Sequence, residues 1–418
     1  MFKFIHTADI HLDSPLRGLE AHEGAPVEEI RGATRRAFTS MVDLALQEPV
    51  DFILIAGDVF DGDWKDYNTG LFFIREMGRL EQAGIKVFMI AGNHDATSSI
   101  TRTLSLPANV VRFSDKICES VELPEFKVMI HGRSYQTAAV TDNLAAEYPN
   151  FSSNHFNIGL LHTSLTGRDG HASYAPCSKG DLTSKGYDYW ALGHVHAREV
   201  VSEDPHIIFP GNLQGRHIRE VGAKSVTLVT VDDGTIVNMK AVEVDVLRWD
   251  VCRLDVSGCD SEKTLIDQVR AGMAEAAAST AGRPLALRLV LEGLSPLHEE
   301  LQARSYHWLE EFRAVSAALG TIWLEQVKFR TSRNISLEQL IGEDSPLYNV
   351  LQAAGSLQLD DEMLDLLASE LVGLKAKLPA ELTEVGALLD CAGEQVQEIQ
   401  EDVREMLLAR LLRQGEER

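Results

Sequence analysis

Residues 52–61 read Phe-Ile-Leu-Ile-Ala-Gly-Asp-Val-Phe-Asp, an apolar run of strand length that ends in glycine and aspartate. Such a run, closed by turn residues, is typical of a buried β-strand. The same pattern occurs four more times before residue 200. The other apolar runs are residues 2–7, 87–91, 158–161 and 189–192, each followed by Asp, Asn, His or Gly. The first half of the chain therefore predicts buried strands that end in polar side chains.

Segments of helical periodicity separate the first three of these strands, over roughly residues 28–46 and 67–83. Strands that alternate with helices favour parallel pairing, and loops at the carboxyl ends of parallel strands line the ligand site. We therefore expect an α/β fold in which the five polar clusters converge on one edge of a sheet.

The pattern changes after residue 244. Strand candidates alternate with helix candidates, which predicts a small separate α/β module. The strand candidates are residues 249–256, 285–291 and 322–329, and the helix candidates are 262–278 and 299–318. We expect three segments in all: residues 1–244, residues 245–334 and residues 335–418.

The third segment is helical in pattern and acidic. An apolar stripe at helical spacing runs along it. The stripe consists of Val396, Ile399, Val403, Leu407 and Leu411. Such a face either completes the protein's own core or docks on a partner, and the sequence leaves both readings open.

The charge of the chain is strongly acidic, with 63 Asp and Glu against 39 Lys and Arg, a net of -24. Taken alone, this argues against nucleic acid as a partner, because phosphate binding usually leaves a basic surface. However, residues 335–418 hold 18 acidic and 6 basic residues, and residues 245–334 hold 13 and 11. Half of the net charge thus lies in the third segment, so a nucleic-acid substrate is not excluded.

The location of the protein follows from two absences in the sequence. Residues 1–9 contain His6 and Asp9, which interrupt any signal-peptide core, and no stretch approaches the ~18 apolar residues of a membrane span. We therefore expect a cytoplasmic protein with no membrane association.

The polar clusters contain seven residues suited to metal binding. Oxygen donors come from two carboxylates and one amide, and the other four donors are imidazoles. The candidates are Asp9, His11, Asp58, Asn93, His162, His194 and His196. Mixed oxygen and nitrogen ligands suit first-row divalent metals. Seven candidates serve two ions better than one, and a structural zinc would usually require thiolates, which are absent nearby.

The spacing within these clusters suggests roles for their members. Ile10 separates Asp9 from His11, which in an extended segment would put both side chains on one side of the chain. Two adjacent ions can clamp a phosphate and activate water for attack on phosphorus. His94 follows a candidate ligand directly, and we expect it to act as general acid, with Asp61 or Asp95 orienting its ring.

A lone Asp-x-His or Gly-His-x-His is a weak signal, since short polar runs after strands are often turn residues. The stretch Gly92-Asn93-His94-Asp95 alone is explained equally well by a turn. Taken in order, the set Asp9-x-His11, Gly57-Asp58-x-x-Asp61, Gly92-Asn93-His94-Asp95, His162 and Gly193-His194-x-His196 resembles the calcineurin-like metallophosphoesterases over about residues 1–244. The resemblance implies a four-layer α/β/β/α sandwich around two mixed sheets. It also implies two divalent ions, with manganese as the expected metal, and His94 as the catalytic histidine with Asp61 as its carboxylate partner.

The same resemblance assigns the seven ligands to two ions. One ion would be held by Asp9, His11, Asp58 and His196. The other would be held by Asp58, Asn93, His162 and His194. Asp58 would therefore bridge the two ions.

Longer stretches narrow the resemblance. Residues 6–15, 57–61 and 187–194 look like the SbcD-type DNA repair nucleases, and residues 210–220 are similar to the YhaO group among them. Eukaryotic and archaeal members carry histidine where this chain has Asp61, so their proton handling does not transfer.

The narrower resemblance implies roles for the rest of the chain. Residues 245–334 would form a capping domain that steers duplex DNA toward the metals. Residues 335–418 would form a helical segment that docks on an SMC-like ATPase of the SbcC or YhaN type. Arg216, His217 and Arg219 are candidate phosphate contacts.

The sequence therefore predicts a two-metal-dependent DNA nuclease of DNA repair that works with such an ATPase. We expect an exonuclease, with endonuclease cleavage as an additional option, and a homodimer is left open. Two alternatives remain. One is a phosphodiesterase or phosphatase of small phosphoesters, and the other is a non-catalytic subunit that binds DNA ends as a scaffold.

Overall fold

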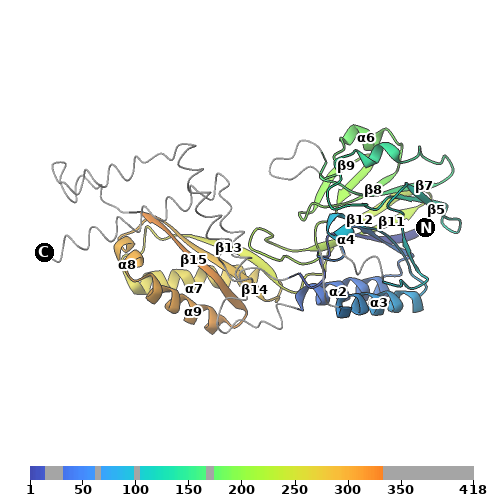
Figure 1. Ribbon diagram of the computed structural model, residues 1–418. Helices are drawn as coiled ribbons and strands as arrows, with labels where there is room; N and C mark the ends of the chain where they lie inside the picture. The colour runs from blue at the N-terminus through green and yellow to red at the C-terminus, as the bar shows by residue number, and fades with distance from the viewer. Residues whose placement is uncertain (15–31, 62–66, 98–103, 166–173, 333–418) are drawn as a thin grey trace. The chain divides into compact units, whose positions relative to one another are not determined.

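A computed structural model of the chain is drawn in Figure 1, and it describes residues 1–14, 32–61, 67–97, 104–165 and 174–332. Residues 333–418, which include the apolar stripe from Val396 to Leu411, lie outside the described residues. Among the helices that are described, none combines the length and apolar character needed to cross a membrane.

The first sheet has six strands in the order β12-β11-β1-β2-β3-β4. Its strands are β1 (Phe2–Thr7), β2 (Phe52–Ala56), β3 (Lys86–Ile90), β4 (Val110–Arg112), β11 (Ser225–Asp232) and β12 (Thr235–Glu243). Strands β1 to β4 are parallel, as the alternation of strands and helices predicts. The last two strands pair antiparallel, which makes the sheet mixed.

The second sheet also has six strands, in the order β5-β6-β7-β8-β10-β9. Its strands are β5 (Glu119–Leu123), β6 (Val128–Gly132), β7 (Phe156–His162), β8 (Tyr189–Gly193), β9 (Glu199–Glu203) and β10 (His206–Phe209). The four central strands are parallel and the two outer strands pair antiparallel with their neighbours.

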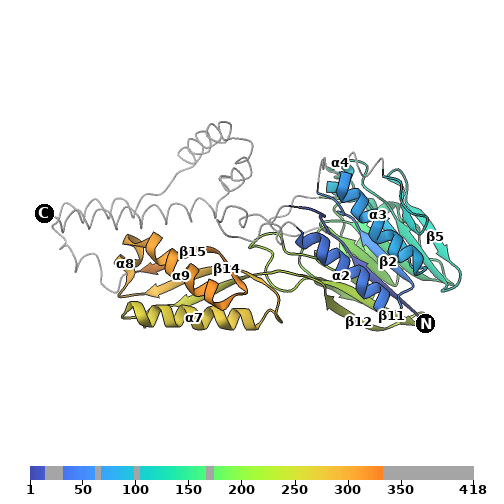
Figure 2. The same cartoon turned by 90° about the horizontal axis from the view of Figure 1, so that it is seen from below.

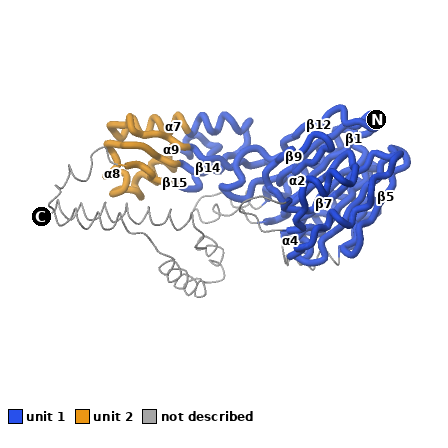
Figure 3. Tube along the Cα trace, turned by 90° about the horizontal axis from the view of Figure 1, so that it is seen from above, with its two compact units in different colours: residues 1–252, 273–289, 316–326 blue, residues 253–272, 290–315, 327–418 orange. Residues whose placement is uncertain are grey.

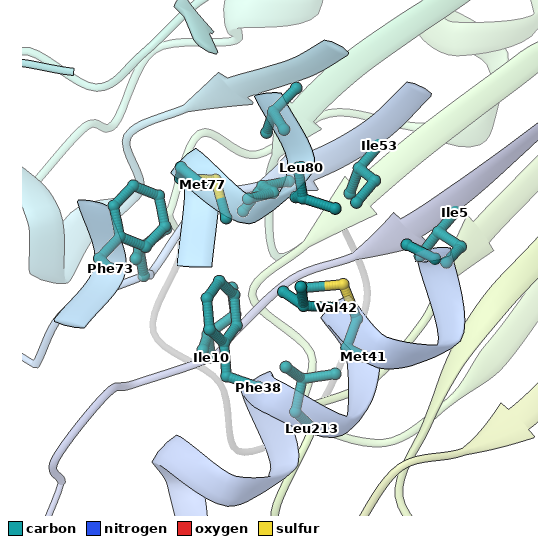
Figure 4. Close-up of a cluster of buried hydrophobic side chains, with 14 of the residues drawn as sticks. Ile5, Ile10, Phe38, Met41, Val42, Ile53, Phe73, Met77, Leu80 and Leu213 are labelled. Carbon is teal, nitrogen blue, oxygen red and sulfur yellow. The ribbon is translucent and has the colours of Figure 1, made fainter. Parts of the chain in front are cut away.

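Two helices cover the outer face of the first sheet, α2 (Ala33–Gln47) and α3 (Tyr67–Gln82). They lie side by side over its strands (Figure 2). Phe38, Met41 and Val42 of α2 are buried at helical spacing and pack with Ile5 and Ile53 of the sheet (Figure 4). Alternation along each strand sends the neighbouring side chains to the opposite face of the sheet.

That opposite face packs against the second sheet. Phe4, Phe52 and Phe88 of the first sheet share one buried cluster with Ile158 and Tyr189 of the second. On the far side of the second sheet, a further cluster is covered by a 3-10 turn (Leu144–Glu147), by α6 (Lys179–Thr183) and by loops. The four-layer α/β/β/α sandwich is thus confirmed, with a thin outer layer on the second sheet.

The remaining described residues form a three-stranded sheet of order β13-β14-β15. Its elements are β13 (Arg248–Asp255), α7 (Glu262–Ala278), β14 (Leu285–Leu294), α8 (His298–Ala303), α9 (Ser305–Leu319) and β15 (Ile322–Ser332). The helix expected over residues 299–318 is wrong as a single element. The ψ of 32° at Arg304 departs from helical geometry, and the structure has two helices there.

The chain divides into two compact units (Figure 3). Of the described residues, those within 1–252, 273–289 and 316–326 form the first unit, and those within 253–272, 290–315 and 327–332 form the second. The domain boundaries after residues 244 and 334 stay predictions.

Candidate metal centre

The polar clusters come together from both sheets of the sandwich. Asp9 and His11 follow β1, Asp58 follows β2 and Asn93 follows β3, whereas His162 ends β7 and His194 and His196 follow β8. The expectation that one sheet edge supplies all five clusters is therefore wrong. The site lies where the carboxyl ends of the parallel strands of two packed sheets meet.

The backbone around Asp9 and His11 is not extended, which corrects a second expectation. Their φ angles are 50° and 45°, in the left-handed region, and Asp58 has a φ of 54°. This conformation costs about 1–2 kcal/mol per residue. Hydrogen bonds hold the loop in place, because the carbonyl oxygen of Asp58 accepts the N–H groups of Ile10 at 2.8 Å and His11 at 3.0 Å.

At two positions near the site only glycine fits, because atoms of neighbouring segments lie too close for a side chain. A Cβ atom on Gly92 would lie 2.3 Å from Oδ1 of Asp58, and one on Gly193 would lie 2.0 Å from the carbonyl oxygen of Ala56. Both distances are below any real contact, so these loops can approach the neighbouring strand only with glycine.

One group of donors consists of Asp9, His11 and His196, whose ligand atoms all lie within 4.8 Å of one another. The Nε2 atoms of His11 and His196 are 3.3 Å apart. Two imidazole nitrogens that face each other at this distance require a proton or a cation between them. The donor set therefore fits a bound cation.

A second group consists of Asp9, Asp58 and His162 within the same limit. Nε2 of His162 lies 3.4 Å from Oδ2 of Asp58 and 2.9 Å from Oδ1 of Asn93. The backbone N–H of His194 donates to both carboxylate oxygens of Asp9 at 3.0 Å. The structure thus brings six of the seven candidate ligands together by side-chain donor distances.

The seventh candidate ligand, His194, is placed beside the cluster by the position of its ring. Its ring centroid lies 5.2 Å from that of His162. Its φ of 102° places its backbone in the left-handed region.

Burial and neighbouring charges together set the pKa values of this cluster, in which Asp9 and Asp58 are each 1% exposed. Burial raises the pKa of Asp9 and lowers that of His11 to about 3. Burial also acts to raise the pKa of Asp58, but the nearby charge of His162 outweighs it and the pKa falls below its ordinary range. In turn, burial acts to lower the pKa of His162, yet Asp58 brings it to about 9. Two carboxylates this close in a buried site favour divalent cations.

His94 has a carboxylate partner beside this cluster. Its Nδ1 lies 2.9 Å from Oδ1 of Asp61, and this hydrogen bond raises the pKa of His94. Asp61 also accepts a hydrogen bond from the hydroxyl of Ser14 at 2.7 Å. The other candidate partner, Asp95, accepts the backbone N–H groups of Phe60, Val59 and Gly92 instead. Asp61 is therefore the carboxylate that lies against His94.

The three candidate phosphate contacts are placed differently. Nη1 of Arg216 lies 3.4 Å from Oγ of Ser14 and 4.0 Å from Oδ2 of Asp61. His217 lies 3.6 Å from Glu220, and Arg219 is exposed. Arg216 thus contacts Ser14 and approaches Asp61, the partner of His94.

Sequence reasoning missed two supporting side chains. Tyr135 donates its hydroxyl to the carbonyl oxygen of His162 at 2.8 Å, and Glu220 lies 2.6 Å from Nδ1 of His196. Burial acts to raise the pKa of Glu220, but His196 and Arg216 hold it well below its ordinary range. Glu220 follows Arg216 by four residues, which is the only local signal for it.

In the comparison with known proteins, family profiles match two regions of the chain. The profile of the calcineurin-like phosphoesterases matches residues 2–198, and that of the metallophosphoesterase YhaO, middle domain, matches residues 249–332. The uncharacterized metallophosphoesterase YhaO of Bacillus subtilis (strain 168) is 40% identical over 300 residues, which cover 70% of this chain and 72% of the relative.

More distant similarity extends to archaeal proteins. The DNA double-strand break repair protein Mre11 of Sulfurisphaera tokodaii is 26% identical over 275 residues, or 62% of this chain and 67% of the relative. Mre11 of Methanopyrus kandleri is 25% identical over 300 residues, or 65% of this chain and 63% of the relative.

Proposed function

The chain belongs to the calcineurin-like metallophosphoesterases, in the YhaO group, and on this premise we propose that it is a two-metal-dependent DNA nuclease. Membership makes it a phosphoester hydrolase that uses divalent metal ions. The observation that carries the proposal is the cluster of metal donors with His94 and Asp61 beside it. DNA as substrate is supported by the similarity to two Mre11 proteins of DNA double-strand break repair.

The proposed ligand sets share one carboxylate. Asp9, His11 and His196 would hold one ion together with Asp58, which would also serve the second ion. The remaining ligands of the second ion would be Asn93, His162 and His194. When bound, two such ions clamp a phosphate, neutralise its charge and lower the pKa of the attacking water. We propose manganese as the metal, since imidazole and carboxylate donors accept it.

His94 supplies the proton in this proposal. Its Nδ1 is held by Asp61 at 2.9 Å, so Nε2 is the nitrogen that can face a substrate. The attacking water loses one proton to solvent as its oxygen forms a new bond to phosphorus. The bond from phosphorus to the leaving sugar oxygen breaks, and Nε2 of His94 donates its proton to that oxygen. The hydrogen bond to Asp61 raises the pKa of His94, which favours the protonated ring that a general acid requires.

Arg216 would bind the phosphate beside this acid. Its guanidinium reaches toward Asp61 and Ser14 while its side chain is 13% exposed, so its position is defined by contacts. Bidentate recognition of phosphate suits an arginine better than a lysine. His217 and Arg219, which lie close by in the chain, are proposed as weaker contacts to the DNA backbone.

The test is hydrolysis of linear duplex and single-stranded DNA with manganese, with EDTA and after His94→Ala. We expect metal-dependent exonuclease activity, no activity with EDTA, and a loss on the order of 10²-fold or more in the variant. His155→Ala is a matched control, because His155 pairs with Ser152 and Glu122 away from the metal donors. Closed circular DNA in the same assay tests for endonuclease cleavage.

Four outcomes would contradict the proposal. Cleavage of DNA in EDTA, or full activity of His94→Ala, would exclude the mechanism. Hydrolysis of bis-p-nitrophenyl phosphate without any degradation of DNA would indicate a phosphoesterase of small substrates, and DNA binding without turnover under any metal would indicate a scaffold subunit.

We further propose that residues 245–334 cap the DNA and that residues 335–418 dock on an SMC-like ATPase of the SbcC or YhaN type. Similarity of residues 249–332 to the YhaO middle domain supports a separate module there. A pull-down from the native host with the intact chain tests the partner, with Val403→Asp and Leu407→Asp together as the variant. The variant is expected to lose the ATPase while keeping its activity on DNA, and retention of the ATPase would contradict docking through this stripe.

A further inference from the structure

We propose that Glu220 is a positioning residue of the metal centre, which fixes the ring of His196 and holds the guanidinium of Arg216 beside the site. The inference rests on the proposed two-metal function and adds a residue outside the ligand set. The Glu220 side chain is 6% exposed and lies between a candidate ligand and a candidate phosphate contact.

The hydrogen bonds of Glu220 define where the hydrogens lie. Oε2 accepts the backbone N–H of Arg216 at 2.7 Å and the side-chain amide of Asn212 at 2.9 Å. Oε1 accepts Nη2 of Arg216 at 3.3 Å and lies 2.6 Å from Nδ1 of His196. Amide and guanidinium nitrogens can only donate, so both oxygens of Glu220 are acceptors. Nη2 of Arg216 also lies 3.2 Å from Nδ1 of His196, but the shorter contact, 2.6 Å, is to a Glu220 oxygen that only accepts. The hydrogen between Glu220 and His196 therefore belongs to Nδ1 of His196.

This arrangement selects one tautomer of His196. A neutral imidazole with its hydrogen on Nδ1 has its lone pair on Nε2. That Nε2 is the atom 3.3 Å from Nε2 of His11, inside the group formed with Asp9. Glu220 thus turns the lone pair of His196 toward the metal side of the ring. Metal-binding histidines characteristically donate their other N–H to a carboxylate in this way.

Glu220 also determines where Arg216 points. Nη2 of the guanidinium is bound to Glu220, and Nη1 extends to Oγ of Ser14 at 3.4 Å. The same Nη1 lies 4.0 Å from the carboxylate of Asp61, which contacts His94. One carboxylate therefore connects the candidate ligand His196 with Arg216, whose guanidinium reaches toward Asp61, the partner of His94.

The loop that carries Glu220 is itself anchored. Gln214 donates its side-chain amide to the carbonyl oxygen of Leu247 at 2.6 Å, and the indole of Trp249 donates to the carbonyl oxygen of Gly215 at 2.9 Å. Gln214 and Trp249 are both buried. Because the loop is fixed on this side, Glu220 can impose an orientation on His196 and Arg216 instead of following them.

The first test is a calorimetric titration of the metal-free full-length chain with Mn²⁺. Glu220→Gln keeps the shape of the side chain but removes the acceptor charge, and we expect the Kd of one of the two ions to rise about 10–100-fold. Glu325→Gln is the matched control, since Glu325 is 9% exposed and pairs with Arg288 at 2.7 and 2.8 Å on another sheet. The control should bind Mn²⁺ with the wild-type Kd, and a wild-type Kd in Glu220→Gln would overturn the proposal.

The second test needs no variant of Glu220 and therefore does not depend on that variant folding. In ¹⁵N-histidine-labelled, metal-free protein at mildly alkaline pH, the His196 ring, assigned by its loss in His196→Gln, should carry its hydrogen on Nδ1. A hydrogen on Nε2 would overturn the proposal. Both measurements are independent of DNA hydrolysis, so failure of the nuclease proposal would be recognised separately.

Discussion

Nδ1 of His94 lies 2.9 Å from Oδ1 of Asp61, and the same carboxylate oxygen lies 3.4 Å from Nδ1 of His11. Asp61 therefore contacts the proposed acid and a proposed ligand at the same time. Asp61 thus links the ring of His94, which it holds by a hydrogen bond, to the ring of His11 beside it.

The dependence on leaving group should reveal the role of His94. His94→Ala is expected to lower the rate of DNA hydrolysis on the order of 10²-fold or more, because a sugar alkoxide needs a proton to leave. With bis-p-nitrophenyl phosphate the loss should be much smaller, since p-nitrophenolate leaves without a proton. Initial rates on both substrates with saturating manganese provide the comparison. Equal losses on the two substrates would argue for a binding role of His94 instead.

Removing the charge of Asp61 should shift the pH dependence of DNA hydrolysis. The hydrogen bond that His94 donates to Asp61 raises the pKa of His94, so the ring stays protonated to higher pH. In Asp61→Asn this stabilisation is lost, the pKa of His94 falls, and the alkaline limb of the kcat/KM profile should move to lower pH. The profile is measured on linear duplex DNA with manganese. An unshifted alkaline limb would mean that another group titrates there.

Metal binding should stabilise the folded chain through Asp58. An ion that binds only the folded state at 100 times its Kd adds about 2.7 kcal/mol to the free energy of unfolding. Manganese should therefore raise the Tm of the wild type, and Asp58→Asn should remove most of this rise. Thermal unfolding in EDTA and in manganese measures it for both proteins. Asp267→Asn, at an exposed helix position paired with Arg270, serves as the control that keeps the full rise.

His6 should make stability depend on pH below neutrality. Burial lowers the pKa of His6 in the folded protein to about 3, while its two ring nitrogens contact Tyr189 and the carbonyl oxygen of Leu192. The unfolded chain binds the proton near pH 6.5. The stabilising contribution is therefore complete above this pH and is lost as the pH falls from about 6.5 toward 3.

The measurement is the free energy of unfolding in urea, in EDTA, between neutral and acidic pH. The slope in the wild type should exceed that of His6→Gln by up to about 1.4 kcal/mol per pH unit. Identical slopes in the two proteins would show that His6 is not the group responsible.

Two glycines should respond in opposite ways to alanine. A Cβ on Gly159 in β7 would lie 2.4 Å from the ring of Trp190, so Gly159→Ala should cost about 1–3 kcal/mol by overpacking. Gly78 lies within α3 and its added Cβ would meet nothing within 4 Å, so Gly78→Ala should stabilise by up to about 1 kcal/mol. Urea unfolding of both variants in EDTA tests the pair. A neutral Gly159→Ala would mean that Trp190 can move aside.

Much of the fold could be predicted because its signals are local. The apolar run of residues 52–56 is β2. The helix predicted over roughly residues 67–83 is α3, which ends one residue earlier, at Gln82. The alternation of such elements then favoured parallel strands, which the structure has in both sheets. The same locality explains the error at Arg304, where one backbone ψ angle interrupts a continuous helical pattern.

The sequence by itself determined which residue types end each strand, and hence which side chains are available to the candidate metal centre, from Asp9 to His196. Only the tertiary structure decided how these residues meet. In the folded protein Asp61, and not Asp95, lies beside His94, and the loops of the site come from two sheets. The backbone at Asp9 and His11 is left-handed, and Glu220 lies against His196. The physical reason is the distance along the chain over which each interaction acts. Strand and helix propensities act between neighbours, whereas a hydrogen bond across 24 residues exists only after the sheets have packed and brought the loops together.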